Sequence, residues 1–173
     1  MSVTYKGNNN SSYEDEYSGN VVIPETVEAY VATEFDEEGN LELTQITGIL
    51  PANTAVIVKA AAESYSFAYS AEKGTAVTNL LEGTTVQTNI DEAAYVLGNA
   101  NGIGMYKAAL NVSTDTTNDG TEEAPAVTYE AWLNNAFKAY LPASAVPASA
   151  QNAANFSFRF GEGTTGIDEI TEN

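Results

Sequence analysis

Short apolar runs recur along the chain from Val21 onward, separated by residues that favour turns. In two runs, residues 65–69 and 156–160, aromatic residues alternate strictly with other residues, so that each run places three aromatic rings on one side. Because successive side chains of a strand point to opposite faces, this period of two predicts β-strands with one buried face. Further strands are predicted over residues 21–23, 28–33, 40–46, 55–60, 84–90, 94–97 and 104–110.

The order of these runs predicts one domain over residues 21–173, preceded by an acidic polar arm over residues 1–20. Many short strands between turn signals are typical of an all-β fold. We expect an antiparallel β-sandwich, with the jelly roll as one candidate arrangement and at most one short helix. Residues 129–140 allow two interpretations. Their apolar positions suit a helix, whereas their last part resembles a strand stopped by Pro142, so a short helix running into a strand is one expectation.

Charge and size narrow the possible partners. The chain has 173 residues and 43% hydrophobic residues, which is enough to bury a core. Six basic residues against 24 acidic ones give a formal charge of -18. Such a chain repels phosphate backbones and anionic membrane surfaces, so we expect neither nucleic-acid binding nor membrane insertion. The simplest interpretation of the charge is a solvated acidic surface; a cation site or a basic partner is the alternative.

Missing residue types argue against an enzyme. The chain has no Cys and no His, which removes thiolate chemistry and the commonest general base. Catalysis by paired carboxylates remains open, because it needs only two acids with one raised pKa. Most of the 24 acids fall in hydrophilic clusters, where a raised pKa is not expected. We therefore predict a protein without catalytic residues and without a required cofactor.

Seven phrases occur in a fixed order: EAYV (28–31), GILPANTAVIVK (48–59), NLLEGT (79–84), AYVLG (94–98), GMYK (104–107), KAYLP (138–142) and FSFRF (156–160), followed by TGIDEI (165–170). In this order they resemble a β-rich accessory module near the C-terminus of many secreted and surface proteins of Bacteroidetes, including BspA-type leucine-rich-repeat surface proteins. The resemblance covers about residues 21–170. It implies an all-β module that is secreted or on the cell surface, and it carries no catalytic residues. Residues 113–126 and the acidic segment before Val21 depart from it.

Two groups of residues are candidates for binding. Calcium prefers oxygen ligands at alternating loop positions, which Asp115, Thr117, Asp119 and Glu122 offer around Gly120. The bidentate Glu expected at the twelfth loop position is absent, so a solvated acidic loop is the simpler interpretation. The second group is aromatic. Tyr129, Trp132 and Tyr140 could stack on a sugar ring or anchor a protein partner, and burial in the core is the simpler alternative.

The leading expectation for function is a non-enzymatic surface or extracellular module for adhesion, assembly or presentation, with a protein or a glycan as partner. A carbohydrate-binding module using the aromatic group is the first alternative. A structural virion or fibre subunit is the second. It is motivated by a start at Met1 without an apolar leader region, which equally fits a chain whose leader was removed.

Overall fold

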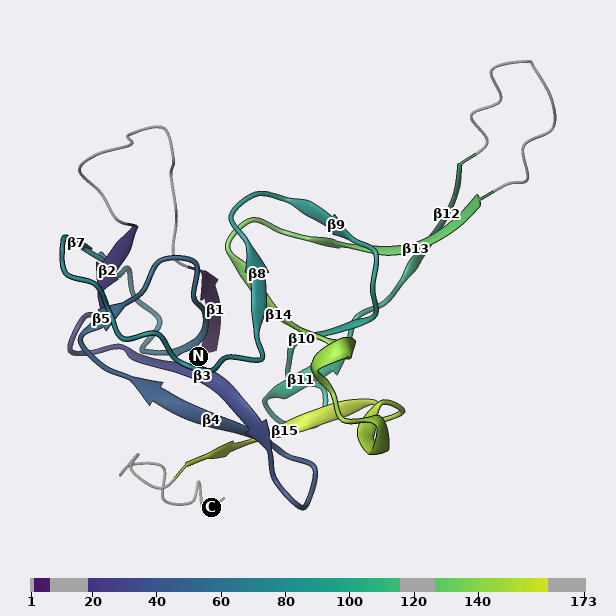
Figure 1. Cartoon of the computed structure of the whole chain (residues 1–173), viewed down its shortest axis with the longest axis horizontal. Helices are drawn as coiled ribbons and strands as arrows, with labels where there is room; N and C mark the ends of the chain where they lie inside the picture. The colour runs from purple at the N-terminus through teal and green to yellow at the C-terminus, as the bar shows by residue number, and fades with distance from the viewer. Residues whose placement is uncertain (1, 7–18, 116–126, 162–173) are drawn as a thin grey trace.

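The computed structural model describes residues 2–6, 19–115 and 127–161, and this part of the chain is all-β (Figure 1). Two short 3-10 helices, η1 (Ala143–Ala145) and η2 (Ala148–Ala150), accompany the strands. The strands are β1 (Ser2–Lys6), β2 (Asn20–Val22), β3 (Glu28–Phe35), β4 (Leu41–Ile46), β5 (Ile49–Leu50), β6 (Ala55–Lys59), β7 (Tyr69–Ser70), β8 (Glu82–Thr84), β9 (Thr88–Ile90), β10 (Ala94–Gly98), β11 (Gly104–Lys107), β12 (Asn111–Asp115), β13 (Val127–Asn134), β14 (Lys138–Pro142) and β15 (Asn155–Phe160).

A nine-stranded sheet forms the body, in the order β1-β6-β3-β4-β15-β11-β10-β14-β8. Its middle strand, β15, belongs to two pairings. Its first residues pair antiparallel with β11, and its last residues pair with β4. A strand that changes partners in this way makes a corner between two packed sheets. The first half (β1, β6, β3, β4) therefore folds over the second half (β11, β10, β14, β8), and both β1 and β6 lie against β14.

This arrangement confirms the predicted all-β, sandwich-like class, with one exception in strand direction. The pairing of β15 with β4 is parallel, whereas the other described pairings are antiparallel. The parallel pairing lies at the corner, where β15 leaves β11 and continues along β4.

The main core lies between the two halves. Tyr30 and Leu41 from the first half meet Tyr95 and Met105 from the second half, and all four are almost completely buried. Phe156 packs against Tyr95 with ring centroids 4.7 Å apart. The alternating strand predicted at residues 156–160 is confirmed: Phe156, Phe158 and Phe160 all pack on this core.

Both halves are also covered on their outer faces. The small sheet β5-β2-β7 packs Val21 and Leu50 against the outer side of β3 and β6. On the other half, β9 and β13 place Ile90 and Trp132 over β10 and β14. Beyond this contact, the β12–β13 hairpin projects from the body (Figure 1).

Several local predictions are wrong. Residues 65–68 form no strand; Tyr65 and Phe67 lie on the outer core of the first half, and only Tyr69 and Ser70 pair, as β7. The Tyr65 and Phe67 rings are partly buried against the sheet without extending its edge. Residues 84–90 break into β8 and β9.

Of the two interpretations of residues 129–140, the strand stopped by Pro142 is confirmed as β14, and the helix is absent. This segment forms β13 and β14 around a turn, because β13 finds a partner in β9 and β14 in both β10 and β8.

The first twenty residues are not an arm throughout, since Ser2–Lys6 pairs with β6 as β1. Residues 7–18 lie outside the described part. Within the described residues, no helix is long and apolar enough to cross a bilayer.

Candidate functional site

The structure brings two of the predicted aromatic residues together, but inside the protein. Trp132 is 6% exposed and Tyr140 is 5% exposed. Their rings meet edge to face, with centroids 5.2 Å apart and planes at 83°. The Trp132 Nε1 donates a hydrogen bond to the Glu92 carbonyl oxygen at 3.1 Å. The Tyr129 side chain lies outside the described part.

The surroundings of Tyr140 explain its protonation. Its hydroxyl donates to the Glu82 Oε2 at 3.0 Å. Burial, followed by the hydrogen bond and the charge of Glu82, raises the pKa of Tyr140 to about 12, so the phenol is a neutral donor at physiological pH. A sugar ring stacks on an exposed aromatic face, and neither Trp132 nor Tyr140 offers one here. Both rings serve as outer core for the second half of the sheet.

The predicted calcium ligands are mostly outside the described residues. Asp115 ends β12, where its backbone pairs with Val127. Thr117, Asp119 and Glu122 lie in the undescribed segment, so calcium binding there stays a prediction. In the described ranges, no group of three or more acidic side chains is arranged to hold a metal ion.

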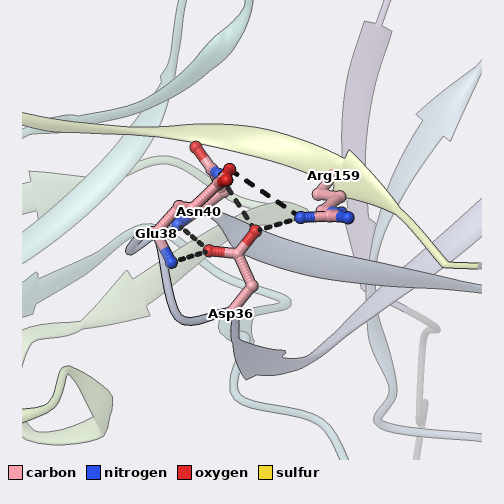
Figure 2. Close-up of polar contacts among 4 residues, drawn as sticks. All are labelled: Asp36, Glu38, Asn40 and Arg159. Atoms are coloured by element: carbon pink, nitrogen blue, oxygen red, sulfur yellow. Dashed lines mark hydrogen bonds and ion pairs between the residues drawn. The ribbon is translucent and has the colours of Figure 1, made fainter.

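The best-defined polar cluster closes the turn between β3 and β4 (Figure 2). The Asp36 Oδ1 accepts from the backbone N–H groups of Glu38, at 2.9 Å, and Asn40, at 2.8 Å. Its Oδ2 accepts from the Asn40 side chain at 2.9 Å and from the Arg159 Nη1 at 3.1 Å. The bonds from Asn40 and Arg159 lower the pKa of Asp36 to about 2. With both oxygens occupied, this carboxylate fastens β15 to the turn and is not available for chemistry.

A pair of glutamates is the closest approach to the carboxylate chemistry considered above. Glu34 and Glu42 face each other across the β3–β4 pairing, next to a bulge. Their hydrogen bond, with partial burial and mutual repulsion, raises the pKa of Glu42. Glycosidase carboxyl groups stand about 5 Å or more apart to admit a sugar carbon or a water. Glu34 is exposed, so the raised pKa of Glu42 reflects two acidic side chains side by side at the surface and not a carboxyl group buried for catalysis.

An open groove of about 340 Å³ lies between the end of β4, β5 and the loop after β7. Its polar lining is Gln45, Thr47, Lys73 and Thr75. Ile46, Ile49, Gly74 and Val77 complete the lining, which contains no acidic residue. Sequence reasoning missed this site, because its two sides are about 30 residues apart and neither carries a motif.

Three apolar side chains are exposed where the β8–β9 turn lies beside the end of β13 and the β13–β14 turn: Val86 at 65%, Leu133 at 48% and Phe137 at 40%. We call them the turn patch. The Phe137 N–H donates to the Thr84 carbonyl at 2.7 Å, which joins the β8–β9 turn to the β13–β14 turn. Phe137 has φ 59°, a left-handed conformation that is strained for a bulky residue. Such strain persists where the surroundings impose it, and it is often kept at functional sites.

We compared the chain with known families, proteins and structures. A scan of family models, a search of curated proteins and a search of solved structures each found no match. The resemblance to the Bacteroidetes accessory module therefore stays a prediction.

Proposed function

We propose that this chain is a non-enzymatic module of a secreted or cell-surface protein, which attaches to another protein through the turn patch. The observation that carries the proposal is the exposure of Val86, Leu133 and Phe137 on neighbouring segments, since the Phe137 N–H bonds the Thr84 carbonyl and Leu133 pairs with Asn89 of β9. Single exposed apolar residues are ordinary, whereas a group of them on one surface indicates an interaction site.

The conformation of Phe137 supports this role. A Gly or Asn at φ 59° would fold with less strain, yet the chain places an exposed aromatic ring there. Aromatic residues are the side chains that interfaces use as anchors. Phe137 strains the turn, and a Gly or Asn there would stabilise it. A contact between the Phe137 ring and a partner protein accounts for this strained residue.

Charge indicates the kind of partner. With 24 acidic and six basic residues, the chain attracts proteins that present a basic rim around an apolar centre. This complementarity steers the encounter, and the apolar contact in the middle holds the complex. Adhesion to a basic surface protein or matrix protein fits both features.

The test is adhesion of beads coated with the full chain to epithelial cell layers and to immobilised matrix proteins. We expect the unaltered chain to attach and Phe137→Gly to lose most of that attachment. The Gly variant should stay folded, with stability within about 1 kcal/mol, because relief of strain offsets the greater freedom of the unfolded chain.

Asn53→Gly is the matched control. Asn53 is the other described non-glycine residue with positive φ, at 57°, and it lies on a different turn. Its substitution changes the same backbone property without touching the turn patch, so attachment should be unchanged. Equal attachment of all three proteins, or no attachment by the unaltered chain, would refute the proposal.

A further inference from the structure

We infer that the groove between β4, β5 and the loop at residues 73–77 is a binding site for a carboxylate-bearing sugar unit, such as a uronic acid or a sialic acid. The site is separate from the turn patch and goes beyond protein attachment. Lys73 would bind the sugar carboxylate, and the hydroxyl and amide groups around it would bind the ring hydroxyls.

The polar groups of the groove are available for a ligand. Within the described ranges, the side chains of Gln45, Thr47, Lys73 and Thr75 make no hydrogen bond or ion pair with the protein. Two other cations are paired, Lys59 with Glu28 at 3.0 Å and Arg159 with Asp36 at 3.1 Å, whereas Lys107 and Lys138 lie outside the groove. Lys73 therefore stands in the groove without a described counter-charge.

The loop that carries Lys73 is fixed from both sides, although it has no regular secondary structure. On one side, the buried Asn20 donates from its Nδ2 to the Glu72 carbonyl at 3.0 Å. On the other side, Gly74 packs so closely that an added Cβ would lie 2.5 Å from the Ile49 carbonyl oxygen. A loop held in place loses less entropy when a ligand binds, which favours a preformed site.

Size and chemistry together indicate a sugar rather than a bare anion. A volume of about 340 Å³ is at the small end of ligand sites, and it suits one ring with its substituents. The three polar uncharged side chains can each donate and accept, as ring hydroxyls require. Ile49 and Val77 supply an apolar wall for the C–H face of the ring. A carboxylate is the substituent that Lys73 selects, since charged hydrogen bonds are the strong ones.

The experiment is a titration of the full, isotopically labelled chain followed by NMR, with glucuronate, N-acetylneuraminate, glucose and acetate as the four probes. We expect at least one of the two acidic sugars to shift the backbone amides of Thr47, Lys73 and Thr75. Glucose has the same ring as glucuronate without the carboxylate, and it should bind about tenfold more weakly or not at all. Acetate should not bind measurably.

The decisive variant is Lys73→Gln, which keeps an exposed polar side chain and should weaken the acidic sugar about tenfold. Lys107→Gln is its control, because Lys107 is also an exposed lysine and lies outside the groove. The two substitutions change the net charge by the same amount. Silence of both acidic sugars, equal binding of glucose, equal binding of acetate, or an unchanged affinity of Lys73→Gln would each overturn the inference. Bead attachment through the turn patch is measured separately, so the two proposals can fail independently.

Discussion

Replacing Trp132 by Ala tests whether this ring is core or binding surface. Trp132 is 6% exposed, stacks edge to face on Tyr140 and donates to the Glu92 carbonyl. Truncation of a buried Trp costs about 3–5 kcal/mol of folding free energy. The outer core around Trp132 is small, with three other buried residues, so it can relax partly and we expect a value near the lower end, about 3 kcal/mol.

The assay is urea unfolding followed by far-UV circular dichroism, since the chain has a single Trp and the variant has no indole fluorescence. For a chain of this length, a loss of about 3 kcal/mol lowers the melting temperature by about 6–12 °C. An unchanged slope against urea would show that the variant still unfolds from a native-like state.

Leu133→Ala is the matched control, because Leu133 is the next residue on β13, points to the opposite face and is 48% exposed. Its stability should change by less than about 0.5 kcal/mol, while its bead attachment falls. If Trp132→Ala cost less than about 1 kcal/mol, or if Leu133→Ala cost as much, the assignment of the two faces of β13 would be wrong.

Three further predictions concern the framework. Asn79→Ala should lower the free energy of unfolding by about 2–4 kcal/mol in urea, because its side chain bonds Ala32, Ala55 and Leu81 and leaves buried backbone groups unpaired when it is removed. Gly104→Ala should cost about 1–3 kcal/mol in the same assay, since a Cβ there overlaps the Phe156 carbonyl and forces β11 from β15; no loss would refute that close approach. The variants Asp36→Asn and Glu42→Gln should change the stability of the protein in opposite directions, as measured by the midpoint of urea unfolding between pH 3 and pH 7. The pKa of Asp36 is lowered from 3.8 to about 2, so its stabilisation is present above its unfolded pKa and lost as pH falls toward 2, and Asp36→Asn should weaken the protein most at neutral pH. The pKa of Glu42 is raised, so its contribution is lost as pH rises through that pKa, and Glu42→Gln should stabilise the protein at pH 7; a change of the same sign for both variants would contradict the assignment.

The sequence predicted the strands well where burial is local. Residues 28–33 and 55–60 are apolar on both faces, and β3 and β6 prove to be covered on both sides. It failed where long-range pairing decides the outcome. Residues 65–69 have a strand pattern, yet residues 65–68 form no strand, and Tyr65 and Phe67 pack partly buried against a neighbouring sheet.

The candidate site shows the same limit. The sequence offers Trp132 and Tyr140 as candidate aromatic residues, together with Tyr129, but their spacing favours a helix that does not form. Their contact and burial depend on Ile90 and Ala94, which precede them by about 40 residues. The turn patch and the groove each join segments that are far apart in the chain, so no local pattern announces either one. The sequence also does not predict the positive φ at Phe137. Its neighbours Asn135 and Ala136 fit a turn, but they do not indicate which backbone conformation Phe137 adopts.

The two proposed sites bind ligands of opposite charge, so their binding should depend differently on salt. A basic protein approaching the turn patch is attracted by the whole acidic surface, and this attraction weakens as salt screens it beyond about 8 Å at physiological ionic strength. An acidic sugar approaching Lys73 is repelled by the same surface and held only by a contact within hydrogen-bond distance. Salt screens the distant repulsion more than the near attraction, so sugar binding should persist under ionic conditions that release the protein partner. A groove lined without any acid, in a chain with 24 of them, is the arrangement that such a ligand requires.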